Sequence, residues 1–189
     1  MDAATLLPEP GDPGTYRIAL VCLGNICRSP MAHVVLAARV EDAGLAHRVH
    51  LESFGTGDWH VGRPMDHRAA AALTAEGYDA TRHRARRFTV READAFDLVL
   101  AMDHDNHDDL ADLGVDPSRL RLFRSFDPQL DVQPDGQPDG QPDGQEGADA
   151  SADVPDPYYD DDGFADVLDI VERTSARLVH LLQRQTSPA

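Results

Sequence analysis

The chain has 189 residues, a length that suits one domain with a sizeable core, and 41% of its residues are hydrophobic, which is ordinary for a globular protein. Its net charge of −17 at pH 7 argues against a general nucleic-acid binder. No stretch approaches the roughly 20 apolar residues that a membrane helix needs, so neither nucleic acid nor a membrane is an expected partner.

The N-terminal segment, residues 1–15, is rich in Pro, Gly and acidic residues, and we expect it to be a disordered tail. It lacks a basic start followed by an apolar run, so no signal peptide is predicted and the cytoplasm is the expected location. The only cysteines, Cys22 and Cys27, are too few for a disulfide framework or a four-thiolate zinc site. The histidines form no convincing ligand pattern either, so neither a metal nor another cofactor is predicted.

The first predicted element is a buried strand over residues 17–21, which ends at Cys22. Gly24 and Asn25 then allow a tight loop. Ser29 and Pro30 resemble a helix start, with Ser as the N-cap and Pro at the first helical position, and the helix is expected to run to residue 41.

Later segments alternate between the two kinds of element. Strands are expected at residues 49–54, 96–101 and 120–123, and helices at residues 66–76 and 104–113. The C-terminal helix places its apolar residues on one face: Phe164, Val167, Leu168, Val171, Leu178 and Leu182. Strands that alternate with helices predict an α/β fold with a parallel sheet, in which ligands bind beyond the carboxyl ends of the strands.

Residues 131–154 interrupt this pattern. QPDG occurs three times in a row over residues 133–144, and an acidic stretch of Ala, Asp and Gly follows. The segment has almost no core-forming residues, so we interpret it as a flexible acidic insertion, with a binding element as the alternative.

The loop between the first strand and the first helix has the composition of a phosphate site. Hydrolysis of a phosphate ester needs a nucleophile in line with phosphorus, donors for three equatorial oxygens, and an acid for the leaving oxygen. Backbone N–H groups of such a loop converge on one anion, and the helix N-terminus adds positive potential that also favours a thiolate. Cys22 would supply the sulfur, Arg28 a planar fork for two phosphate oxygens, and Ser29 a hydroxyl donor to that sulfur. The spacing of Cys22 and Arg28 alone is a weak signal, and a buried core thiol at a strand end is the alternative.

The stretch CLGNICRSP, from Cys22 to Pro30, resembles the signature of the low-molecular-weight protein tyrosine phosphatases. Three further segments resemble parts of that family in the right order: residues 56–60 (TGDWH), 101–103 (AMD) and 156–159 (DPYY). The similarity runs from about residue 16 to residue 182, with the QPDG segment as its main interruption. It implies a single domain over residues 16–186, with a four-stranded parallel sheet flanked by helices in a flavodoxin-like three-layer α/β/α arrangement.

The resemblance also implies roles for residues. Cys22 would be the nucleophile, Arg28 would stabilise the transition state, and Asp156 would be the general acid. The remaining residues would bind the substrate, from the loop or from an aromatic slot: Leu23, Gly24, Asn25, Ile26, Cys27, Ser29, Trp59, Tyr158 and Tyr159. His83 would support the loop through buried hydrogen bonds. The expected partners are phosphotyrosine-containing proteins or peptides, with phosphate or another oxyanion in the loop, and the expected state is a monomer.

Two alternatives use the same fold. An arsenate reductase would pass oxidation along further cysteines, but none follows Cys27, so an external thiol would have to complete the cycle. A non-catalytic phosphopeptide-binding module would keep Arg28 and dispense with the acid. Within the enzyme interpretation, phosphoarginine and small aryl phosphates remain possible substrates. A disulfide between Cys22 and Cys27 that protects the nucleophile from over-oxidation is a further hypothesis.

Overall fold

The computed structural model describes residues 7–131, 152–159 and 163–186 of the chain. A parallel sheet of four strands forms its centre, in the order β2-β1-β3-β4. The strands are β1 (Tyr16–Cys22), β2 (Val49–Gly55), β3 (Leu98–Ala101) and β4 (Leu120–Leu122). The predicted α/β fold with four parallel strands is therefore confirmed.

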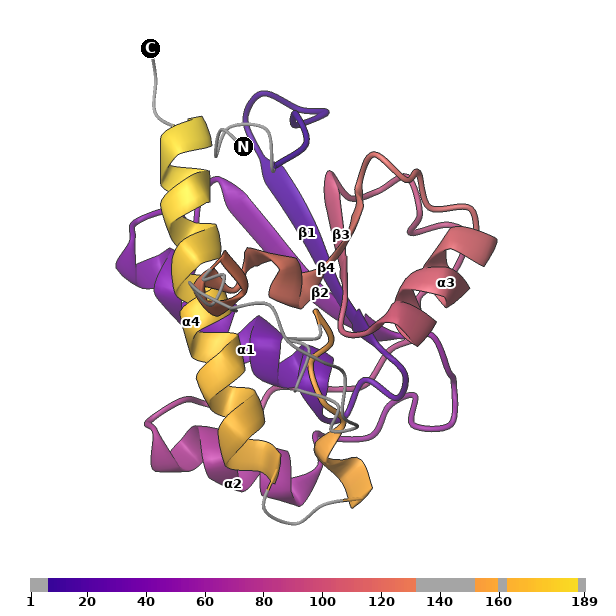
Figure 1. Cartoon of the computed structure of the whole chain (residues 1–189), viewed down its shortest axis with the longest axis vertical. Helices are drawn as coiled ribbons and strands as arrows, with labels where there is room; N and C mark the ends of the chain where they lie inside the picture. The colour runs from indigo at the N-terminus through magenta and orange to yellow at the C-terminus, as the bar shows by residue number, and fades with distance from the viewer. Residues whose placement is uncertain (1–6, 132–151, 160–162, 187–189) are drawn as a thin grey trace, which may run out of the picture.

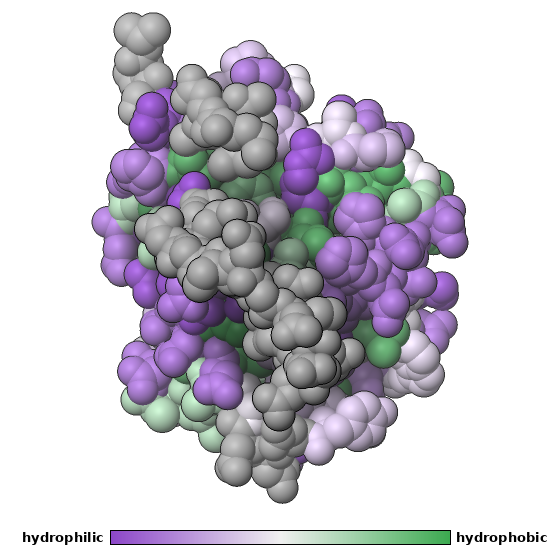
Figure 2. All heavy atoms as spheres, in the orientation of Figure 1, coloured by the Kyte–Doolittle hydropathy of each residue, from purple (hydrophilic) through white to green (hydrophobic). Residues whose placement is uncertain are grey.

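Helices cover both faces of the sheet (Figure 1). They are α1 (Arg28–Asp42), α2 (His67–Ala75), α3 (His104–Asp112) and α4 (Gly163–Thr186), and three short 3-10 turns accompany them, η2 (Phe123–Phe126), η3 (Pro128–Asp131) and η4 (Pro157–Tyr159). α1 and α4 lie together on one face of the sheet, and α3 lies on the other. In Figure 2, hydrophilic residues cover much of the outer surface beside α3 and α4.

The alternation of side chains along β1 divides the core into two layers. Ile18 and Leu20 belong to the cluster that also contains the apolar face of α4, whereas Ala19 and Val21 belong to the cluster with Leu110 of α3. Both faces of the central strand are thus buried, as expected for a parallel sheet between helices. All six apolar residues predicted for the buried face of α4 are buried.

Three predicted boundaries need correction. α1 begins at Arg28, two residues earlier than predicted, and its N-cap is Cys27 with no side-chain cap. Ser29 therefore lies inside the first turn, where its hydroxyl bonds to other partners. The predicted strands at 96–101 and 120–123 are also shorter in the structure, because residues 96 and 97 precede β3 and Phe123 begins η2.

The expectation of a disordered tail over residues 1–15 does not hold for residues 7–15. Leu7 is buried in the core, and the Tyr16 hydroxyl donates to the Pro8 carbonyl at 3.1 Å. The Gly11 N–H donates to the Asp97 carboxylate at 2.7 Å. Ordering the segment costs conformational entropy, and a polar segment buries little apolar surface to offset that cost. These contacts offset it for residues 7–15. The QPDG repeats lie outside the described residues.

The carboxyl ends of three neighbouring strands meet at one edge of the sheet. Cys22 at the end of β1 is paired in register with Gly55 of β2, and Val21 with Ala101 of β3. The loop after β1 passes directly over Gly55, since a Cβ built there would lie 2.7 Å from the Leu23 carbonyl oxygen and 3.1 Å from the Asn25 nitrogen. The backbone of the loop thus packs directly against the backbone of Gly55 at the end of β2.

We expect Gly55→Ala to destabilise the fold by about 1–3 kcal/mol, because the added methyl group meets backbone atoms that cannot rotate away. Urea unfolding monitored by circular dichroism measures this change. Gly14→Ala is the matched control, since a Cβ there meets only the Asp12 carboxylate at 3.6 Å. An equal loss of stability in both variants would contradict the close-approach argument.

Candidate active site

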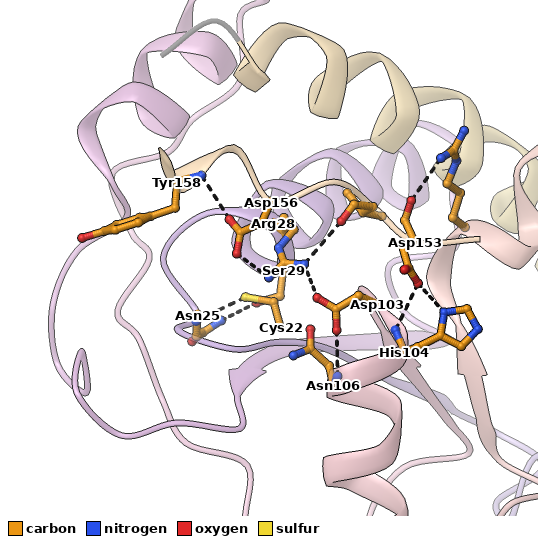
Figure 3. A network of polar contacts seen from close by, with 12 residues as sticks. Cys22, Asn25, Arg28, Ser29, Asp103, His104, Asn106, Asp153, Asp156 and Tyr158 are labelled. Carbon is orange, nitrogen blue, oxygen red and sulfur yellow. Dashed lines mark hydrogen bonds and ion pairs between the residues drawn. The ribbon is translucent and has the colours of Figure 1, made fainter. Parts of the chain in front are cut away.

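The loop from Cys22 to Ser29 connects β1 to the N-terminus of α1 (Figure 3). Asn25 has a φ of 53°, in the left-handed region, and is the only non-glycine residue with positive φ in the described part of the chain. Asn tolerates that conformation better than most residues. The Asn25 N–H points back at the Cys22 sulfur at 3.3 Å, so the loop curls around this atom.

The Cys22 sulfur also lies 3.0 Å from the Ser29 hydroxyl. That hydroxyl has one proton and a second acceptor, the Phe54 carbonyl at 3.1 Å. When Cys22 is a thiolate, the Ser29 proton can turn to the sulfur, and when Cys22 is a thiol, the Cys22 proton can turn to Ser29. The pair is therefore suited to both ionisation states of the sulfur.

The Asn25 side chain fixes the shape of the loop from behind. Its amide nitrogen donates to Ser29 at 2.9 Å and to Ser53 at 3.2 Å. Its side-chain oxygen accepts from the Arg86 N–H at 2.8 Å, and its backbone oxygen accepts from His83 at 2.7 Å. Burial, assisted by the nearby arginines, lowers the pKa of His83, so the ring is a neutral donor at neutral pH. The predicted contact of His83 with the loop is present.

Arg28 is buried, with 3% of its surface exposed, and it contacts two carboxylates. One terminal nitrogen donates to Asp103 and to the Val154 carbonyl at 3.3 Å, and the other donates to Asp156 at 2.7 Å. Burial by itself lowers the pKa of Arg28, but Cys22, Asp156 and Asp103 outweigh that effect and raise it. The guanidinium is thus a permanent cation, aimed at the mouth of the loop by Asp103.

Asp103 combines two tasks at the end of β3. One of its carboxylate oxygens bonds Arg28, and the other accepts from the Asn106 N–H at 2.7 Å as the N-cap of α3. Asp103 belongs to the AMD segment, and no individual role was predicted for it. An Asp before a predicted helix is a cap signal, but the sequence does not show that Arg28 lies beside it.

A cavity of about 380 Å³ opens over the loop. The residues that line it come from the loop, from the segment after β2 and from η4 with the residue before it: Cys22, Leu23, Gly24, Ile26, Cys27, Arg28, Trp59, His60, Asp156, Tyr158 and Tyr159. Nearly all the predicted site residues therefore meet in one place. The exceptions are Asn25 and Ser29, which lie beneath the cavity and support its floor. His60 was not among the predicted site residues.

The aromatic residues form an open wall on the cavity. Trp59, Tyr158 and Tyr159 are 67%, 40% and 92% exposed, and the two tyrosine rings meet edge to face at 5.1 Å. The Trp59 ring lies against the backbone of Gly57, where a Cβ would be 1.4 Å from a ring atom. Arg68 supports this wall by donating to the Tyr158 carbonyl at 3.1 Å. The cavity therefore has an aromatic lining that comes from the segment after β2 and from η4.

A larger cavity, of about 710 Å³, lies behind the loop. Ser53, His83 and Arg86 line it, but neither Cys22 nor Arg28 does.

Within the described residues, no group of three or more His, Cys, Asp or Glu side chains could hold a metal ion. In the same part of the chain, no helix is long and apolar enough to cross a membrane.

Comparison with known proteins identifies the family. The family model described as low molecular weight phosphotyrosine protein phosphatase matches residues 17–140. A low molecular weight protein-tyrosine-phosphatase of Streptomyces coelicolor is 42% identical over 175 residues, which cover 90% of this chain and 96% of that protein. The low molecular weight protein-tyrosine phosphatase A of Mycobacterium tuberculosis is 40% identical over 156 residues, covering 82% and 84%.

Solved structures agree with this result. The crystal structure of YfkJ from Bacillus subtilis superposes with a TM-score of 0.77 at 27% identity, covering 95% of this chain and 100% of that one. A protein tyrosine phosphatase from Entamoeba histolytica, with Hepes in its active site, superposes with a TM-score of 0.75 at 27% identity, covering 90% and 98%. The chain belongs to the low-molecular-weight protein tyrosine phosphatases, which are hydrolases.

The two cysteines of the loop differ in environment, and we expect them to differ in reactivity. Burial, together with Asp66 and Cys22, raises the pKa of the Cys27 thiol well above its ordinary value. At pH 7 iodoacetamide should therefore modify Cys22 at least about tenfold faster than Cys27, and inorganic phosphate should slow the reaction. Peptide mass spectrometry after timed labelling measures both rates. Faster labelling of Cys27 would contradict the assignment of these environments.

Proposed function

We propose that the chain hydrolyses phosphotyrosine monoesters of proteins or peptides in two steps, through a cysteinyl phosphate on Cys22. The observation that supports this most is the convergence of three groups on one cavity: a sulfur inside the curl of the loop, a buried guanidinium, and the carboxyl group of Asp156 at 2.7 Å from that guanidinium. They correspond to the nucleophile, the charge stabiliser and the acid that ester cleavage needs.

In the first step, the phosphate dianion enters the loop and competes with Asp156 for the terminal nitrogen of Arg28 that Asp156 occupies. The Cys22 sulfur attacks phosphorus in line with the bond to the tyrosyl oxygen. Once phosphate has displaced it from Arg28, the Asp156 carboxylate takes up a proton from solvent. As the bond to the tyrosyl oxygen breaks, Asp156 gives this proton to the departing oxygen, so that a neutral tyrosine leaves. The backbone N–H groups and Arg28 hold the three equatorial oxygens as charge spreads over them.

In the second step, Asp156 accepts a proton from a water molecule that attacks the cysteinyl phosphate. The sulfur–phosphorus bond breaks and inorganic phosphate leaves. Ser29, at 3.0 Å from the sulfur, stabilises the thiolate that is released. Its side chain can do so because Asn25 donates to it on another side and leaves its proton free to turn.

The aromatic walls support phosphotyrosine as the substrate class. A tyrosyl ring reaches from the loop to the rim of the cavity, where Trp59 and Tyr158 offer apolar faces. A phosphoserine side chain has no ring to place between them. An arsenate reductase has less support, because Cys22 and Cys27 are the only cysteines and a relay through a further internal thiol has no residue to use.

We also propose that the protein acts in the cytoplasm as a monomer. A reducing compartment would keep Cys22 and Cys27 as the thiols that the mechanism needs. The acidic surface, with a net charge of −17, opposes association between copies of the chain.

The direct test is steady-state hydrolysis of p-nitrophenyl phosphate at about pH 6 in the presence of EDTA. We expect the wild type to turn over and Cys22→Ser to show no activity above background. We expect Asp156→Asn to lower kcat by about 10²–10⁴-fold, because it removes the acid while keeping the shape of the side chain.

Asp105→Asn is the matched control, since Asp105 is exposed on the first turn of α3, outside the cavity. It should retain full activity. Stoichiometric binding of phosphopeptide without turnover would favour the binding module, and activity in Cys22→Ser would exclude the cysteinyl phosphate.

A further inference from the structure

Asp153 lies three residues before Asp156, and its carboxylate contacts His104, the first residue of α3 (Figure 3). One oxygen of its carboxylate accepts from the His104 N–H at 3.0 Å and from the His104 ring at 2.6 Å. Its backbone oxygen accepts from Arg124 at 3.0 Å. We propose that Asp153, with His104 and Arg124 as its partners, is a positioning residue that places Asp156 over the loop. The proposal rests on the phosphatase function proposed above.

The Arg124 contact connects this segment to α4. Arg124 also donates to the buried carboxylate of Asp127 at 3.3 Å, and Arg173 of α4 donates to the same carboxylate at 2.8 Å. The backbone of Asp153 is therefore bound to the Arg124 side chain, which the ion pair with the buried Asp127 carboxylate holds in place. On its other side, the next residue, Val154, donates its N–H to the Met102 carbonyl at 2.7 Å.

These contacts matter because the bond between Asp156 and Arg28 is temporary. Phosphate must displace Asp156 from the terminal nitrogen of Arg28, and Asp156 must then give a proton to the leaving oxygen. At that moment Arg28 no longer holds the acid in place through its carboxylate. The bonds made by Asp153 and Val154 involve neither phosphate nor the leaving oxygen, so they persist through the step and set the position from which Asp156 acts.

The composition of the segment before Asp156 makes the contacts of Asp153 and Val154 more important for the position of the acid. Residues 133–151 contain no large apolar side chain that could pack into a core. The first described residues after them are Ala152 and Asp153, and Val154 is buried in the apolar core. Asp153 is therefore the first side chain after the QPDG segment that the structure shows bound to the body of the domain by hydrogen bonds.

The pair formed by Asp153 and His104 is partly exposed, with 36% and 65% of the two side chains accessible. Such a pair adds little to global stability, because water competes for the same groups. Its effect should fall on the geometry of the acid step instead, since a small misplacement of a catalytic group lowers its efficiency strongly. That expectation separates a positioning residue from a merely structural one.

The test compares kcat/KM for two substrates that differ in their need for an acid. Phenyl phosphate has a basic leaving oxygen that must be protonated, whereas 2,4-dinitrophenyl phosphate has one that leaves readily as an anion. We expect Asp153→Ala to lower kcat/KM for phenyl phosphate about tenfold and to leave the value for 2,4-dinitrophenyl phosphate within about twofold. Thermal unfolding should be nearly unchanged.

Three further variants sharpen the result. Asp153→Asn keeps an oxygen that can accept both bonds from His104, so it should restore most of the phenyl phosphate activity. His104→Ala removes only the ring donor and should give a smaller loss with the same substrate preference. Asp105→Ala, on the exposed first turn of α3, is the control and should change neither value.

Equal losses on the two substrates, or no loss in Asp153→Ala, would overturn the positioning role. That outcome differs from failure of the proposed function, in which the wild type itself would not turn over or Cys22→Ser would remain active.

Discussion

The site depends on one buried cation. Arg28 has 3% of its surface exposed, and a buried charge is tolerated only where it is paired. Asp103 supplies a pairing that also caps α3, and Asp156 supplies one from a segment far along the chain. In the mechanism that we propose, phosphate and Asp156 bind the same guanidinium, so the acid lies near the reacting centre in the absence of substrate and is released when the substrate binds.

The loop itself is preorganised by neutral hydrogen bonds. Asn25 directs its backbone N–H at the sulfur at the cost of a left-handed conformation, and its hydrogen bonds with Ser53, His83 and Arg86 offset that cost. Donors fixed in this way need no reorganisation when charge develops on the phosphate. The rigid floor of the site contrasts with its rim, where Trp59 is largely exposed.

Local signals predicted the strands and the position of the loop well, because apolar runs and the order of Cys22, Asn25 and Arg28 act over a few residues. The cap on α1 was predicted wrongly because Ser29 before a proline suits an N-cap, and only the fold shows its hydroxyl facing Cys22 and Phe54. The partners of Arg28 and Asn25 could not be predicted from local pattern. Apart from Ser29, four positions after Asn25, the residues whose side chains or N–H groups bond these two side chains are common polar residues that lie 28 to 128 positions away along the chain.

The most direct test of the account is to trap the covalent intermediate. The protein would be mixed with a phosphotyrosine peptide, quenched in acid within the first turnovers, digested, and analysed by mass spectrometry for a phosphoryl group on the loop peptide. We expect phosphorylation of Cys22 in the wild type. We expect a larger trapped fraction in Asp156→Asn when a substrate with a good leaving group is used, because the second step also needs this carboxylate. Turnover with no phosphoryl group on the loop, or with one on Cys27, would contradict it.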